Sequence, residues 1–341
     1  MKSVIGKVLI VFHAFLYTGV AKLHADSYEK MWRQAVKYEE AGLPQSAFKV
    51  VGSIEQKAIK EAKRGQKIAA FLYGCKLRQQ VTPDSFYTDI LRLEQLKQQT
   101  NDEVERAIYA SLLGELLSQN AHRNRNNSNK IDAQADSLKE WSYAQFMKEA
   151  MKNFDQSLSI PKLLAESKSS LYMPFVLRGD DAVYFNDDLL HVLTVRAVNG
   201  MGRYGLQSVD KKKAYYHAAL SEYRRLDNRE AELIFTLDSI DAITTAPLGL
   251  YLRTFGNNVP YEVEQSTYSS ERYKAYINAL NRFGDLPLAV EIYLRMVMLD
   301  VSINQKVKWI NEGYARYADY PRIKKLLNLK KDLEQPTLCL D

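Results

Sequence analysis

Apolar residues recur at helical spacing along nearly the whole chain after Ala25. Pro44 favours the start of one helix, because the N–H that proline lacks would be unpaired there, and Gly42 ends the helix before it. In the helix after Pro44, one face holds Ala47, Val50, Val51, Ile54 and Ala58. The same pattern predicts helices that begin at Asp26 or Ser27 and at Thr82-Pro83, and helices at Val104–Leu117, 137–158, 187–203, 210–227, 229–246, 268–283, 286–299, 303–318 and 321–334.

Two turns between predicted helices share one spacing of small residues. Gly42 precedes Ala47 by the same step that separates Gly284 from Ala289. The glycine allows a tight turn and the alanine lets paired helices approach closely, which resembles tetratricopeptide repeats, although no regular period of about 34 residues runs through the chain. We therefore predict an all-α fold, an irregular tetratricopeptide-like stack of helical hairpins (an α-solenoid) over residues 26–335, with a sub-boundary considered in the polar loop 119–136.

Composition agrees with long helices and few turns. Glycine (15) and proline (9) together are scarce in 341 residues, whereas 46% of the chain is hydrophobic and 26% is charged. These values exclude collagen-like and low-complexity chains, argue against an all-β fold, and leave ample apolar surface for a core.

The first 25 residues have the pattern of a secretory signal peptide. Lys2 and Lys7 supply positive charge, Val8–Tyr17 is a short apolar stretch, and Leu23-His24-Ala25 precedes the expected cleavage. The apolar stretch is too short to span a bilayer, and no later run reaches membrane-spanning length. We expect an exported protein of the periplasm or cell envelope, without a membrane span; the alternative for 1–25 is a buried N-terminal helix.

Charge and cysteine content exclude two classes of site. Removal of residues 1–25 takes away three lysines and no acid, so the formal charge falls from +6 to +3, too low to indicate nucleic-acid binding. The most basic stretch, His122–Lys130, has no aromatic residue for base stacking and is expected to be a solvated loop.

Cys75 and Cys339 are able to pair, but Cys75 lies in the apolar segment Ala69–Leu77, where a buried role is favoured. The chain has no Cys/His cluster, so no structural zinc site is expected.

One short motif matches a nucleotide-binding fingerprint. Gly200, Gly202 and Gly205 spell G-x-G-x-x-G, and Asp227 lies where a ribose-binding acid would stand. A dinucleotide fold needs several alternating strands, and we find no other convincing strand. A helix–helix turn is therefore the favoured interpretation, and no cofactor is expected.

Acidic, histidine and tyrosine residues are the remaining candidates for a catalytic or binding role. Asp180-Asp181 and Asp187-Asp188 flank Tyr184-Phe185; paired carboxyls of this kind suit glycoside hydrolysis, but acids at a helix start more often act as caps. Asp187 and His191 are spaced to pair, but neither His191 nor His217 has the partners of a metal site. Tyrosines recur at helical spacing in three rows, which are Tyr215, Tyr216 and Tyr223; Tyr268, Tyr273 and Tyr276; and Tyr314, Tyr317 and Tyr320. We expect these rows mainly to fill grooves between helices and in part to form a binding surface.

Several sequence blocks follow one another along the chain. The blocks are Ser27–Ala35 (SYEKMWRQA), Gly42–Ile54 (GLPQSAFKVVGSI), Val81–Leu96 (VTPDSFYTDILRLEQL), Ala107–Leu117 (AIYASLLGELL), Glu140-Trp141-Ser142, Ser157–Ala165 (SLSIPKLLA), Tyr172–Gly179 (YMPFVLRG) and Tyr184–Ala197 (YFNDDLLHVLTVRA). Their order resembles the N-terminal helical region of large alpha-2-macroglobulin family proteins of Bacteroidetes. The blocks run in this order from Ser27 to Ala197. The resemblance is taken to extend over essentially all of the chain after the predicted signal peptide.

The resemblance implies an exported relative of protease traps, in which a bait region is cut and the protease is enclosed. The family's thioester, where present, lies in a Cys-x-Glu-Gln segment, and no Glu-Gln pair of this chain has a cysteine two residues before the glutamate. Residues 336–341 would be the start of the first β-sandwich macroglobulin domain, or a free tail.

We therefore expect a non-catalytic N-terminal helical module of an alpha-2-macroglobulin-like endopeptidase inhibitor. It would pack against downstream macroglobulin domains or dock another envelope protein, and would meet target proteases only through the rest of such a protein. The alternative is a free-standing periplasmic tetratricopeptide-like protein that binds an envelope partner or a glycan. No catalytic, cofactor-binding or metal-ligating residue is assigned.

Overall fold

The chain folds into α-helices and short 3-10 helices. The computed structural model describes residues 27–82, 85–123, 138–176, 180–201, 206–244, 261–299, 301–320 and 323–334. In these ranges every regular element is helical, and the only β-type pairing is an isolated bridge between Lys168 and Asp188. The predicted all-α helical stack is confirmed, whereas its tetratricopeptide-like detail stays a prediction. Residues 1–25 and 336–341, the predicted signal peptide and the predicted start of a further domain or tail, lie outside the described residues.

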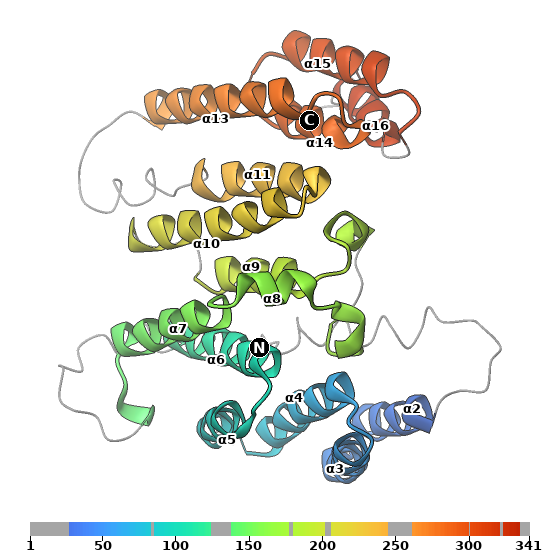
Figure 1. Cartoon of the computed structure of the whole chain (residues 1–341), viewed down its shortest axis with the longest axis vertical. Coiled ribbons are helices and arrows are strands. Elements are labelled where there is room, and N and C mark those ends of the chain that lie inside the picture. Colours follow the sequence, from blue (N-terminus) through green and yellow to red (C-terminus); the bar gives the residue numbers. More distant parts are fainter. Residues whose placement is uncertain are drawn as a thin grey trace, which may run out of the picture. The chain divides into compact units, whose positions relative to one another are not determined.

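The chain separates into two compact units, residues 1–201 and 202–341. The stretch 119–136, considered above as a sub-boundary, lies inside the first unit, where the helices on either side of it pack against each other. The helices of the first unit (Figure 1) are α2 (Ser27–Glu40), α3 (Pro44–Lys60), α4 (Arg64–Val81), α5 (Ser85–Gln99), α6 (Glu103–Arg123), η2 (Leu138–Glu140), α7 (Tyr143–Ser157), α8 (Pro161–Glu166), η3 (Ser169–Tyr172), η4 (Asp180–Phe185) and α9 (Leu189–Gly200).

The expected turn between the first two helices is present. Helix α2 ends at Glu40, Gly42 adopts a positive φ of 71°, and α3 begins at Pro44. The left-handed conformation is one that glycine adopts without a steric penalty, so the residue fits the turn. One part of the loop prediction is wrong: Gln119–Arg123 continues α6, because Ala121 and Asn120 bury their side chains there.

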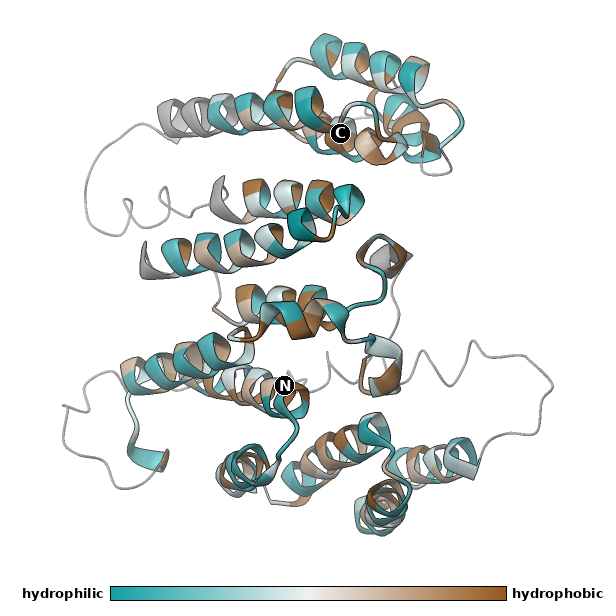
Figure 2. Ribbon diagram, viewed as in Figure 1, coloured by the Kyte–Doolittle hydropathy of each residue, from teal (hydrophilic) through white to brown (hydrophobic). Residues whose placement is uncertain are grey.

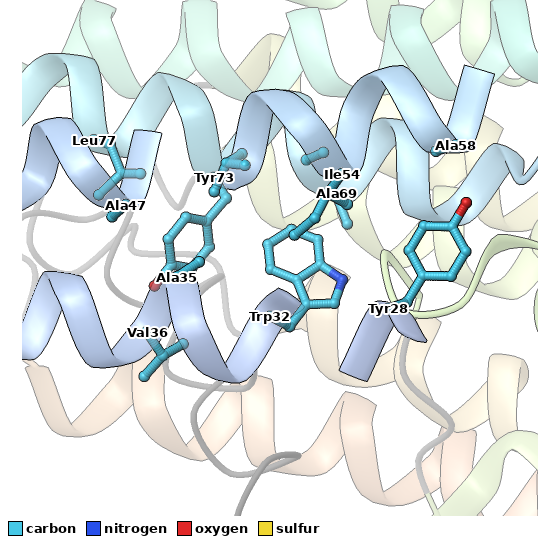
Figure 3. Packing of buried hydrophobic residues seen from close by; sticks show 12 residues of the cluster. Tyr28, Trp32, Ala35, Val36, Ala47, Ile54, Ala58, Ala69, Tyr73 and Leu77 are labelled. Carbon is cyan, nitrogen blue, oxygen red and sulfur yellow. The ribbon is translucent and has the colours of Figure 1, made fainter. Parts of the chain in front are cut away.

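The core of α2, α3 and α4 is built from aromatic residues on small ones (Figure 3). Trp32 and Tyr73 meet edge to face with ring centroids 5.5 Å apart, and Ala47 and Ile54 of α3 complete the cluster. Polar ends of these rings are satisfied at the edge of the core, where Trp32 Nε1 donates to Gln66 at 2.7 Å. Apolar residues accordingly gather where the helices face one another (Figure 2).

Glu39 at the end of α2 is bound by one face of α4. Lys76 Nζ lies 2.7 Å from its carboxylate, Gln80 Nε2 donates at 2.7 Å, and the Tyr73 hydroxyl donates to it as well. Burial alone would raise the pKa of Glu39, but the hydrogen bonds from Lys76, Tyr73 and Gln80 hold it below its ordinary value of 4.5. The carboxylate therefore ties α2 to α4 while it is ionised.

The Glu39→Gln substitution is expected to lower the free energy of unfolding by about 2 kcal/mol at neutral pH, since hydrogen bonds to a charged group are lost. Because the folded pKa is depressed, the contribution of Glu39 is complete above pH 4.5 and is lost as the pH falls through the folded pKa. Denaturant unfolding of both proteins at several pH values should therefore show a gap that closes in acid. A gap that stays constant with pH would contradict this, and Glu40→Gln on the exposed neighbour is the control.

Gly65 near the start of α4 contacts backbone rather than side chains. A Cβ built on it would lie 2.2 Å from the carbonyl oxygen of Met173 and 2.3 Å from the carbonyl carbon of Tyr172, at the end of η3. Neither atom belongs to a flexible side chain. The contact between α4 and η3 therefore requires glycine at this position.

The Gly65→Ala substitution is expected to destabilise the first unit by about 3 kcal/mol, because backbone must separate to admit the methyl group. Gly52→Ala is the matched control, since Gly52 lies inside α3 with no atom within 4 Å of the added Cβ. That substitution should raise stability by about 0.5–1 kcal/mol through helix propensity. Thermal melting followed by circular dichroism compares the two, and similar melting temperatures would refute the close approach.

Phe154 of α7 is buried between two glycines. A Cβ on Gly114 of α6 would lie 2.6 Å from its ring, and a Cβ on Gly200 of α9 would lie 2.4 Å from it. The Phe154 side chain is fully buried. Helices α6, α7 and α9 thus pack closely because the Phe154 ring meets α6 and α9 at positions where glycine leaves room for it.

The second unit is a separate set of helices that pack in chain order. They are α10 (Leu206–Arg225), α11 (Arg229–Thr244), α13 (Tyr261–Phe283), η5 (Pro287–Ala289), α14 (Val290–Val297), α15 (Ile303–Arg316) and α16 (Ile323–Glu334). Figure 1 shows α10 and α11 side by side as an antiparallel pair. Helix α13 begins seven residues before the predicted start at 268.

Arg295 of α14 joins three helices of this unit through carboxylates. Its guanidinium lies 2.8 Å from Asp238 and 3.0 Å from Asp241, both on α11, and 3.5 Å from Glu291. Tyr276 of α13 donates its hydroxyl to Asp241. Burial would lower the pKa of Arg295, but Asp238 and Asp241 raise it above its ordinary value, so the side chain stays charged.

Candidate functional site

A groove of about 680 Å³ lies in the first unit, between α3, α4, the start of α5 and η2. Its apolar lining includes Phe48 of α3, Leu77 and Val81 of α4, and Tyr87 of α5. Phe48 is 38% exposed and Val81 is 52% exposed, whereas Leu77 is buried. Large exposed apolar side chains that gather at one groove mark a binding surface more often than scattered ones do.

The local sequence explains why the groove stays open. The residues of α3 that face α2 and α4 are Ala47, Val51 and Ile54, so Phe48 falls on the flank of that stripe. Helix α4 ends at Val81, and Thr82 takes an extended conformation before α5 begins at Ser85. Helix α4 packs closely on α3 but touches α5 much less, so space remains between α4 and α5.

Basic side chains surround the apolar lining. The Arg78 guanidinium stacks on the Phe48 ring at 5.4 Å, and its Nε donates to the buried carboxylate of Asp89 at 2.9 Å. Lys139 of η2 lies 5.7 Å from the ring centroid of Tyr87, and Lys49 is exposed on α3. No carboxylate occurs among the described residues that line the groove. The site is therefore an apolar groove with a basic rim.

The acidic residues singled out in the sequence lie elsewhere. Asp188 caps α9, with its carboxylate accepting from the His191 backbone N–H at 2.8 Å, as the capping alternative predicted. Asp187 takes a positive φ of 55° in the preceding turn. Asp180 and Asp181 begin η4, but their side chains lie outside the described residues. Of these four side chains the structure describes Asp187 and Asp188, and Asp188 is engaged as a helix cap.

The aromatic, histidine and cysteine candidates have mainly packing roles. Phe185 is buried and stacks on the His191 ring, with centroids 3.8 Å apart. His217 is exposed on α10. Cys75 is a buried free thiol whose pKa is raised by burial, and Cys339 lies outside the described residues.

The G-x-G-x-x-G match begins at the end of a helix. Gly200 is the last residue of α9 and packs on Phe154, whereas residues 202–205 lie outside the described residues. Asp227 is exposed in the turn between α10 and α11, with a positive φ of 51°. The run before the motif is thus helical rather than the strand that a dinucleotide fold requires.

Most described members of the tyrosine rows fill the spaces between helices. Tyr215, Tyr216, Tyr223, Tyr276 and Tyr317 are buried. Tyr273 and Tyr314 are exposed, Tyr320 is half-buried, and the Tyr268 side chain lies outside the described residues. The predicted packing role holds for the buried five, and the exposed pair leaves room for a binding role.

The described residues form neither a metal-binding cluster nor a helix that could cross a membrane. No group of three or more His, Cys, Asp or Glu side chains in these ranges is placed to hold a metal ion. Each helix in the described ranges is too short or too polar to cross a bilayer.

The groove residues were missed in the sequence because their signal is weak. Phe48 lies beside an apolar stripe rather than on it, and Val81 is an exposed apolar residue at a helix end. The sequence signal for the groove is therefore the presence of these two apolar residues outside the buried stripes. Lys139 could not be predicted as a groove residue, because only the tertiary fold brings η2 to the groove.

In comparisons with known proteins, the chain matches no family model, no curated protein sequence and no solved structure.

Proposed function

We propose that the chain is a non-catalytic helical module that acts by docking another protein. The observation that carries this proposal is the groove between α3 and α5, where Phe48 and Val81 expose apolar surface beside basic side chains. Helical stacks commonly act by offering an extended surface of this kind.

The resemblance of the sequence blocks supports a more specific role. In this proposal the chain is the N-terminal helical module of an exported alpha-2-macroglobulin-like protease trap in the periplasm or cell envelope. Its partners are downstream macroglobulin domains or another envelope protein. The all-α fold agrees with that assignment, which rests on the order of the blocks.

A second candidate is a free-standing periplasmic protein that binds an envelope partner or a glycan. One feature of the second unit favours it: Tyr273, 38% exposed, stacks on Trp309 with centroids 5.5 Å apart. Exposed aromatic faces of this kind can carry a sugar ring or a protein side chain.

Photo-crosslinking in the cells that produce the protein tests the docking role. Benzoylphenylalanine placed at Phe48 should crosslink to one polypeptide, whereas the same probe at Ile59, 54% exposed on the same helix, should not. Identification of a polypeptide with macroglobulin domains would support the trap assignment. A partner without such domains would support docking to another protein but not the trap assignment, and equal crosslinking at the two positions would contradict docking at the groove.

A further inference from the structure

We infer that the groove between α3 and α5 binds a peptide segment in which an apolar side chain is flanked by carboxylates. This inference rests on the proposed docking function and names the chemistry of the partner. Three features of the groove support this partner: its apolar walls, the positive charge around them, and the covering of its aromatic rings by basic side chains.

The apolar walls set the central contact. Leu77 lies at the buried side of the groove, and Phe48 and Val81 rise beside it with much of their surface exposed. The volume of about 680 Å³ is within the range of small-ligand pockets, so it admits large side chains rather than a whole folded surface. An aromatic or branched aliphatic side chain inserted here would cover the exposed apolar surface, as in other buried interface anchors.

The charge of the lining selects acidic neighbours for that side chain. The Arg78 charge is balanced by the buried Asp89, which also accepts from Gln79 Nε2 at 3.3 Å. Lys49 makes no ion pair within the described part of the chain, and Lys139 adds a second ammonium group to the lining. Because Lys49 and Lys139 both bring positive charge to the lining, an acidic segment gains attraction and a basic segment meets repulsion.

The aromatic faces argue for a peptide rather than a nucleic acid. Single-stranded nucleic acids bind through bases stacked on open aromatic rings. Arg78 already covers one face of Phe48, and Lys139 lies over Tyr87. A nucleic acid would therefore meet positive charge in the groove but few open ring faces on which bases could stack. An apolar side chain inserted between Phe48 and Val81 does not need an open ring face.

Selection from a random peptide library displayed on phage tests the inference with the full chain. The Phe48→Asp variant, after its helical content has been verified, removes peptides that bind elsewhere. The enriched peptides should share at least one large apolar residue with Asp or Glu beside it. Binding of a labelled enriched peptide is then measured by fluorescence anisotropy.

The chain offers a matched set of variants on one helix. Phe48 and Lys49 lie at the groove, and Ile59 and Lys60 form a second exposed pair of the same type at the far end of α3. We expect Phe48→Ala and Lys49→Glu each to weaken binding by about tenfold or more, and Ile59→Ala and Lys60→Glu to change it by less than about twofold. Added salt should weaken binding of the acidic peptide.

The outcomes distinguish docking at the groove from the acidic character of the partner. Enriched peptides that are neutral or basic, and insensitive to Lys49→Glu, would overturn the acidic partner while docking at the groove stands. Peptides insensitive to Phe48→Ala would overturn docking at the groove itself. Displacement of the peptide by oligothymidylate at equal concentration would assign the groove to nucleic acid instead.

Discussion

The Phe154→Ala variant should lose about 3–5 kcal/mol of unfolding free energy, because a fully buried ring is replaced by a cavity. The site cannot easily collapse, since the ring fills the space between Gly114 and Gly200 and neither glycine has a side chain to enter it. Denaturant unfolding followed by far-ultraviolet circular dichroism measures the loss. A loss below about 1 kcal/mol would show that α6, α7 and α9 do not pack on this ring.

A second substitution makes this test specific to the close approach. In the wild-type background, Gly114→Ala should destabilise, because its Cβ would lie 2.6 Å from the Phe154 ring. In the Phe154→Ala background the ring is gone, and the same change should stabilise by about 1 kcal/mol through helix propensity. The double-mutant cycle therefore predicts a reversal of sign. Equal effects in both backgrounds would contradict the packing described.

The Arg295→Met variant should lose about 3 kcal/mol, because three carboxylates that share one guanidinium are left together without it. Hydrogen exchange should locate the loss in α11, α13 and α14, the helices that this cluster joins. Adding Asp241→Asn to the variant should recover part of the stability by removing one of the unbalanced charges.

The control for this prediction is the same substitution at an exposed ion pair. Arg33 pairs with Glu29 one turn away on α2, where the Arg33 side chain is exposed and the Glu29 side chain is partly exposed. Arg33→Met should change stability by less than about 0.5 kcal/mol. Equal losses at Arg33 and Arg295 would mean that burial of the Arg295 cluster has no energetic consequence.

Local patterns predicted the helices that bury one face. Gly42 and Pro44 marked the first turn, and four of the five residues assigned to the α3 stripe are buried. Asp188 was predicted as a cap and accepts the expected backbone hydrogen bond. These features depend on residues close in sequence, so they could be read without knowing the fold.

Helix α4 was harder to predict because it is buried on several sides. It packs on α3, α5 and η3, so its apolar residues extend around the helix and no single stripe stands out. The sequence therefore showed Ala69–Leu77 only as an apolar segment. A helix surrounded by neighbours loses the periodic pattern by which amphipathic helices are recognised.

The groove depends on contacts between distant residues. Arg78 of α4 is held by Asp89 of α5, and Tyr87 meets Lys139 of η2. None of these pairings follows from helical spacing, since each requires the packing of separate helices. The same is true of Phe154, whose neighbours Gly114 and Gly200 come from α6 and α9.

Hydrogen exchange of the full chain, with and without the selected acidic peptide, tests the central claim most directly. The account predicts slower exchange on binding for residues 44–49 of α3, for the end of α4 and Thr82, and for the start of α5, the segments that line the groove. Exchange near Ile59 and in the second unit should be unchanged. Protection that appears only outside the groove, or no protection at a saturating peptide concentration, would contradict it.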